Sequence, residues 1–111
     1  MSRFDDIRGW AEARNLVKGS TPEKQFTKLI EEVGELAAGI SRGKQPAIED
    51  GIGDAVVVLT ILAAQYHVQI EDCIELAWQE IKDRKGRMVD GVFIKEADLA
   101  CDALKNTLIF N

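Results

Sequence analysis

The chain has 111 residues, enough for one domain and few for two, so we expect a single domain over residues 1–111. Hydrophobic residues make up 46% and charged residues 30%, a composition that excludes a disordered chain. The net charge of −5 argues against general binding to nucleic acids, while two cysteines and one histidine are too few for a disulfide framework or a structural zinc site.

The N-terminal segment MSRFDDIRGW has two aspartates where an export signal would have an apolar run. Residues from about Ser2 to Val17 predict a helix, because Ser2 can cap it and Asp5 and Asp6 suit the positive end of its dipole. We therefore expect a cytoplasmic protein whose chain begins with a helix.

A second helix is predicted from about Pro22 to Arg42. Ser20 or Thr21 caps it, and Gly43 ends it. Its apolar residues recur with the period of a helix and form one stripe: Phe26, Leu29, Ile30, Val33, Leu36, Ala37 and Ile40.

A third helix is predicted from Pro46 to about His67. Its second half, AVVVLTILAA, is apolar on every side, so neighbouring helices must cover it. This stretch is too short for a membrane span of about 20 residues. The pattern of VVVLTIL also allows a buried strand, but no Gly or Pro interrupts the run after Gly53, which favours a helix.

A fourth helix is predicted from about Ile70 to Lys85, with Gly86 as its end and an inner stripe of Ile70, Ile74, Ala77 and Ile81. The segment MVDGVFIK then carries an Asp-Gly turn signal, typical of a small hairpin. A fifth helix is predicted from Lys95 to about Leu108. The sequence thus predicts an all-α bundle of four to five helices.

Acidic residues concentrate on the second and third helices. Glu31, Glu32 and Glu35 share adjacent turns of the second helix, where like charges repel unless a cation offsets them. Asp50 and Asp54 lie in line with the buried stripe of the third helix, where unpaired carboxylates are costly. Mg²⁺, a hard cation with oxygen ligands, would compensate both groups. The alternative is a solvated helix face with salt bridges to Lys28, Arg42 or Lys44.

Three further features have two interpretations each. Gly34, Gly51 and Gly53 lie beside the acids, where a missing side chain allows close approach of either a second helix or a ligand. The basic group Lys82, Arg84, Lys85 and Arg87 either complements the dipole of the fourth helix or binds phosphate. Trp10 and Trp78 are able to stack on a base, but core packing is the simpler role for Trp10.

The segments QFTKLIEEVGELAAGI, EDGIGDAVVVLTIL and IKDRKGRMVDGVF together resemble the MazG-like branch of the all-α nucleoside triphosphate pyrophosphohydrolases. The chain is most similar to the short, single-domain MazG-like proteins of phages, over about residues 10–97. The family pattern is an EExxE helix followed by an ExxD helix. Glu31, Glu32, Glu35 and Asp54 match it, but Gly51 stands where the family has an acid, and Asp50 is the nearest replacement.

The resemblance implies Mg²⁺-dependent hydrolysis of a (d)NTP to the (d)NMP and pyrophosphate, by a homodimer or homotetramer whose sites are lined by more than one chain. On this hypothesis five acids hold the metal: Glu31, Glu32, Glu35, Asp50 and Asp54. Glu32 or Glu35 acts on the attacking water. Four basic residues bind the phosphates: Lys28, Lys82, Arg84 and Lys85.

Two other hypotheses remain open. The chain is either a non-catalytic helical interaction module that uses the same acids as a binding face, or a relative acting on a modified nucleotide such as phosphoribosyl-ATP or dUTP. No nucleic acid or membrane partner is expected.

Overall fold

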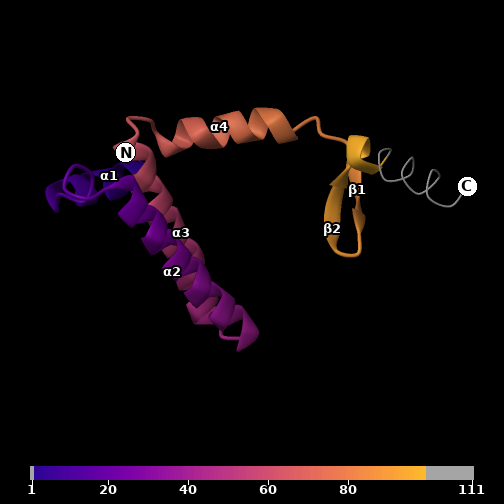
Figure 1. Cartoon of the computed structure of the whole chain (residues 1–111), viewed down its shortest axis with the longest axis horizontal. Coiled ribbons are helices and arrows are strands. Elements are labelled where there is room, and N and C mark those ends of the chain that lie inside the picture. The colour runs from indigo at the N-terminus through magenta and orange to yellow at the C-terminus, as the bar shows by residue number, and fades with distance from the viewer. Residues whose placement is uncertain (1, 100–111) are drawn as a thin grey trace, which may run out of the picture. The chain divides into compact units, whose positions relative to one another are not determined.

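The computed structural model describes residues 2–99, which are mostly helical and include a small β-hairpin (Figure 1). The elements are α1 Arg3–Ala13, α2 Pro22–Ser41, α3 Gln45–Gln65, α4 Ile70–Ile81, β1 Gly86–Val89 and β2 Val92–Lys95. The chain groups into two compact units, Met1–Ile74 and a second unit that begins at Glu75. The helical architecture predicted from the sequence is confirmed, whereas the description as a single domain stays a prediction.

Helix α1 begins as its sequence predicts but ends earlier. The Ser2 hydroxyl accepts a hydrogen bond from the Asp5 backbone N–H, and the Asp5 carboxylate accepts one from the Ser2 backbone N–H, which completes a capping box. The expected end at Val17 is wrong, because Asn15 takes a left-handed conformation with φ of 58° two residues after Ala13.

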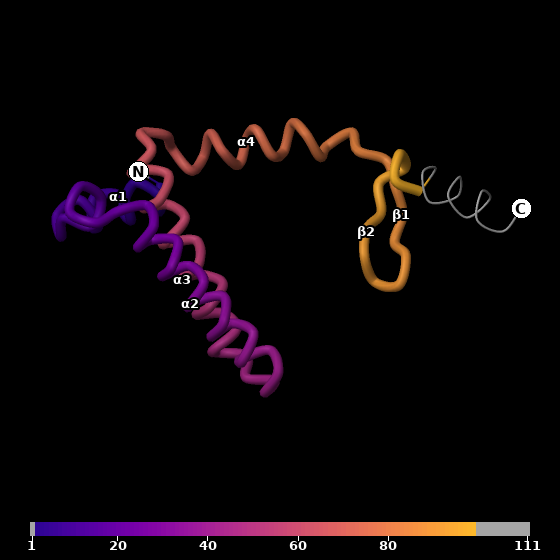
Figure 2. The backbone as a smooth tube through the Cα atoms, viewed as in Figure 1, coloured from indigo at the N-terminus to yellow at the C-terminus, as the bar shows by residue number. Residues whose placement is uncertain are grey.

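Helices α2 and α3 form an antiparallel hairpin (Figure 2). Thr21 caps α2 through the Lys24 N–H, and Gly43 turns the chain with φ of 64°. The VVVLTIL segment lies inside α3, so the helix predicted there is confirmed and the strand is excluded. Among residues 2–99, no helix combines the length and hydropathy needed to cross a membrane.

Glycines set how closely α2 and α3 approach. A Cβ atom added at Gly51 would lie 3.0 Å from Leu36 Cβ and 3.2 Å from Leu36 Cα, and one added at Gly39 would lie 3.3 Å from Ala47 Cβ. Gly34 and Gly53 face open space instead. For Gly51, helix–helix contact is therefore the correct one of the two interpretations. The same contacts set Leu36 level with Gly51 and Gly39 level with Ala47.

Helix α1 packs on α3 and is tied to the start of α4 by an ion pair. The Arg8 guanidinium donates to both carboxylate oxygens of Glu71, at 2.6 and 2.7 Å, and also to Asp5. These bonds hold the pKa values of Glu71 and Asp5 below their ordinary values. The clamp fixes the first turn of α4 to the first unit.

Helix α4 is shorter than predicted. It ends at Ile81 rather than Lys85, closed by bonds from the Lys82 N–H to the Trp78 carbonyl and from the Arg84 N–H to the Ile81 carbonyl. The chain then enters β1, which pairs with β2 in antiparallel register. The predicted Asp-Gly hairpin turn is confirmed, since Asp90 and Gly91 have positive φ values of 49° and 81°. The fifth helix begins at Glu96 and is described to Leu99; its predicted remainder lies outside the described residues.

The apolar stripe predicted for α2 divides into two rows. Leu29 and Leu36 are half-buried, whereas the residues of the adjacent row on α2 are exposed by 47–60%. A second row of exposed apolar residues lies on α3 and at its C-cap, Tyr66. In an antiparallel helix pair, the residue directly after a contact residue lies on the same side of the pair whichever helix it belongs to. We call this side the apolar face; it consists of Phe26, Ile30, Val33, Ile40, Ile52, Val56, Leu59 and Tyr66.

The glycine contacts make a testable prediction about stability. We expect Gly51→Ala to lower the free energy of unfolding, because overpacking against the Leu36 backbone, of about 1–3 kcal/mol, outweighs a gain in helix propensity of about 1 kcal/mol. The matched variant Gly34→Ala has no such contact and should stabilise the protein. Urea unfolding followed by circular dichroism measures both, and equal stabilisation by the two variants would contradict the packing described here.

Candidate functional site

The acids of α2 differ in their surroundings, although they share two turns of one helix. Glu32 is buried, with 6% of its surface exposed, while Glu31 and Glu35 are exposed. Lys28 Nζ lies 3.1 Å from Glu32 Oε1 and 3.8 Å from Glu31 Oε2. The other carboxylate oxygen of Glu32, Oε2, is buried and has no hydrogen-bond partner. A buried carboxylate with one free oxygen is costly unless something donates to or coordinates that oxygen.

Lys28 pairs with only one of the two carboxylate oxygens of Glu32. Its bond to Glu32, with smaller attractions from Glu31 and Glu35, raises the pKa of the Lys28 ammonium above its ordinary value. Lys28 therefore keeps its positive charge beside Glu32. The ammonium pairs with the protein's own carboxylates, as the salt-bridge interpretation of the α2 acids expects for Lys28.

Asp50 and Asp54 of α3 are exposed, so their predicted burial is wrong. The stripe they belong to becomes buried only further along the helix, where Val58 and Ile61 are 5% and 4% exposed. At the two aspartates the space between α1 and α3 is open, and both residues line a cavity there. The sequence places these residues on the correct face but does not show where the covering helix stops.

The acids of the two helices lie on the same side of the α2–α3 hairpin. Leu36 is level with Gly51, and in an antiparallel pair the residues that precede these contact positions, Glu35 and Asp50, flank the contact on the same side. Glu31 and Asp54 fall on that side for the same reason, and the Glu32 carboxylate belongs with them because Lys28 Nζ contacts both Glu31 and Glu32. We call it the acidic face; it lies opposite the apolar face.

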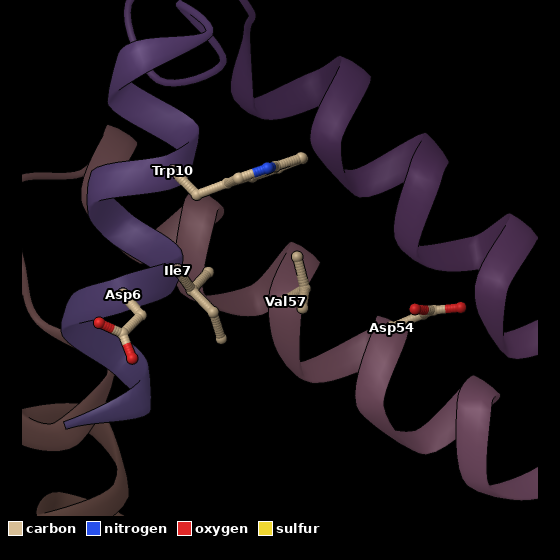
Figure 3. Close-up of a pocket in the computed structure, with 5 residues that line it drawn as sticks. All are labelled: Asp6, Ile7, Trp10, Asp54 and Val57. Atoms are coloured by element: carbon tan, nitrogen blue, oxygen red, sulfur yellow. The ribbon is translucent and has the colours of Figure 1, made fainter.

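A groove runs between α1 and α3 and opens onto Asp54. It contains two cavities, of about 440 and 590 Å³, that share Ile7, Asp54 and Val57. The smaller cavity is also lined by Trp10, whose indole extends from α1 over Val57, while the Asp54 carboxylate points away from α1 at the other end (Figure 3). Core packing of Trp10 is therefore wrong, because 47% of this residue is exposed and its ring forms a wall of the groove.

A divalent cation fits the chemistry of the acidic face. Its donors are carboxylate oxygens, the ligands that Mg²⁺ prefers, and the partnerless Glu32 Oε2 is an oxygen that a cation would satisfy. Within residues 2–99, no three carboxylate, imidazole or thiol side chains converge closely enough to hold a metal by themselves. The five predicted ligands thus share a face without forming a finished cluster.

The basic group Lys82, Arg84, Lys85 and Arg87 lies in the second unit, and its members have separate environments. Lys82 and Lys85 are exposed, and the half-buried Arg84 lies 3.6 Å from the exposed carboxylate of Glu80 in a weak ion pair. Because α4 ends at Ile81, Arg84 and Lys85 belong to the connection that follows it and Arg87 to β1. The interpretation of all four as charges at the end of a helix therefore holds only for Lys82.

Sequence reasoning missed the groove. Phe4, Ile7 and Trp10 recur every third residue along α1, a pattern that indicates an apolar face but does not distinguish a covered face from a cavity wall. The signal available was the pair Asp50 and Asp54 on the third helix, because carboxylates beside an apolar stripe mark an edge that water reaches.

Comparison with known proteins gives two findings. Residues 20–89 match the family model for the MazG nucleotide pyrophosphohydrolase domain, a span that contains all five acids of the acidic face. A 63-residue segment is 56% identical to a Haemophilus phage HP1 (strain HP1c1) protein named "Uncharacterized 18.2 kDa protein in rep-hol intergenic region". That segment is 57% of this chain and 39% of the phage protein. No solved structure matches the chain.

Proposed function

This chain belongs to the MazG nucleotide pyrophosphohydrolase family, and from that premise we propose that it hydrolyses a nucleoside triphosphate to the monophosphate and pyrophosphate with Mg²⁺. The observation that carries the proposal is Glu32, a buried carboxylate on the acidic face with one oxygen paired to Lys28 and the other free. A structural salt bridge accounts for the burial of the oxygen that pairs with Lys28. In this proposal a ligand accounts for the burial of the other oxygen.

The acids of the acidic face are proposed to hold the cation: Glu31, Glu32, Glu35, Asp50 and Asp54. When bound, Mg²⁺ would neutralise triphosphate oxygens and lower the pKa of a coordinated water. Mg²⁺ usually keeps several waters and takes substrate phosphates together with one or two carboxylates. For that reason the acidic face does not need three converging protein ligands before the nucleotide arrives.

Glu32 is proposed to orient the attacking water and accept its proton, with Glu35 as the second catalytic carboxylate. Lys28 fixes Glu32 by the oxygen it already binds, which leaves the free oxygen for the water or the cation. Attack breaks the anhydride between the α- and β-phosphates, and the bridging oxygen leaves with pyrophosphate. Lys28, Lys82, Arg84 and Lys85 are proposed to bind phosphate oxygens, where their charge stabilises that leaving group.

A triphosphate panel tests this function. We expect pyrophosphate release from one or more of the (d)NTPs, with dUTP and phosphoribosyl-ATP included, only when Mg²⁺ is present. Glu35→Gln should abolish turnover, because it removes a carboxylate charge that the proposed site needs. It should leave the helicity measured by circular dichroism unchanged, because the residue is exposed. Pyrophosphate detection in a coupled assay measures the rates.

The matched control is Glu23→Gln, which makes the same change at an exposed acid in the first turn of α2, away from the acidic face. It should retain wild-type turnover. Full Mg²⁺-dependent activity in Glu35→Gln would refute the residue assignment. No turnover of any compound would leave the non-catalytic interaction module as the function of this face.

The apolar face supports a homo-oligomer, a dimer or a tetramer, as part of the same proposal. Each of its eight large side chains is at least 36% exposed, and a second copy of the chain would cover them. Ile30→Asp should shift the protein toward monomer in sedimentation velocity. Leu76→Asp, at an exposed apolar residue of α4, is the control, and a monomeric wild type would reject the oligomer.

A further inference from the structure

The groove between α1 and α3 has a wall that the proposed chemistry does not use. Its smaller cavity, about 440 Å³, is lined by the apolar side chains of Ile7, Trp10 and Val57 and by two carboxylates: Asp54 at one end, and Asp6 of α1, which is paired with Arg3 (Figure 3). This volume is in the range of small-molecule sites, which are mostly apolar with a few polar groups. An apolar slot that ends at a carboxylate of the acidic face suits a ligand with one flat apolar part and one charged part.

We propose that Trp10 is the stacking platform for the nucleobase of the substrate, an inference that rests on the proposed function. The indole is about half exposed and lies over Val57, so the ring face toward the cavity is accessible to a planar group (Figure 3). A base placed there points its sugar and phosphates toward Asp54, where the cation is proposed to bind. Aromatic stacking accepts every base, because every base has a π-face.

The indole is held in place before a ligand binds. The Arg14 guanidinium lies 4.6 Å from the centre of the Trp10 ring, in a cation–π contact, and Arg14 also donates to the Trp10 carbonyl at 3.1 Å. Arg14 is the C-cap residue of α1, four residues after Trp10. A ring that is already fixed loses less side-chain freedom when a base stacks on it.

The assignment separates binding of the base from binding of the phosphates. Removing the Trp10 ring should weaken the binding of compounds that carry a base and should not affect the binding of tripolyphosphate, which has the same chain of three phosphates without a base. Removing the ring should also raise KM more than it lowers kcat, because Trp10 touches neither the attacking water nor the scissile bond in this proposal.

The first experiment measures steady-state kinetics with the best (d)NTP substrate. Trp10→Ala should raise KM about tenfold or more with kcat changed less than about threefold, consistent with the stacking contribution of one base. Trp10→Phe should restore most of the affinity, since a smaller aromatic ring still stacks. The inhibition constant of tripolyphosphate should be the same in all three proteins.

The second experiment needs neither turnover nor an altered Trp10. In Trp78→Phe the fluorescence of Trp10 is observed alone, because the chain has two tryptophans. The Mg²⁺ complex of an α,β-methylene deoxynucleoside triphosphate should quench it with a saturating titration, and Mg²⁺-tripolyphosphate should not.

The outcomes distinguish this inference from the function on which it rests. Quenching by the methylene analogue without turnover of any triphosphate would support the platform and reject the hydrolase. Turnover without quenching, together with an unchanged KM in Trp10→Ala, would keep the hydrolase and reject the platform. An equal loss of affinity for the nucleotide and for tripolyphosphate would also reject it, because Trp10 would then support the whole site rather than the base.

Discussion

The contact between α2 and α3 at Gly51 and Gly39 is the constraint on which the other features depend. A Cβ added at Gly51 would lie only 3.0 Å from Leu36 Cβ, so the two helices approach too closely there for a larger residue, and this contact fixes their register. That register places the carboxylates of both helices on one side and a row of large apolar residues on the other. A displaced register would separate Glu35 from Asp50, and the acidic face would no longer exist.

Local patterns were sufficient for most of the fold. The Ser2 and Thr21 caps, the helical course of α3 and the Asp90–Gly91 turn all follow from interactions within a few residues, and the structure confirms them. The ends of α1 and α4 were misplaced because hydrophobic periodicity continues past the point where the backbone bonds stop. Asn15 ends the first with a left-handed residue, for which asparagine is a weaker signal than glycine.

The sequence identified which residues carry the acidic charge of the site but not which of them are buried. Spacing identified the acids of α2 and α3, yet it favoured Asp50 and Asp54 as buried when Glu32 is the buried one. Burial depends on which neighbouring helix covers a position, and α1 covers the middle of α3 while leaving a groove beside the aspartates. Trp10 was misjudged for the same reason, since the wall of a cavity and the side of a core have the same sequence pattern.

The most direct test of the account is to locate the cation. With Mn²⁺ in place of Mg²⁺ and an α,β-methylene nucleotide bound, paramagnetic broadening in ¹H–¹⁵N spectra reports which amides lie near the metal. The amides of Glu32, Glu35 and Asp54 should broaden first, with Tyr66 at the other end of α3 affected last. Broadening that begins at Tyr66, or that reaches exposed acids such as Glu12 equally early, would contradict a cation site on the acidic face.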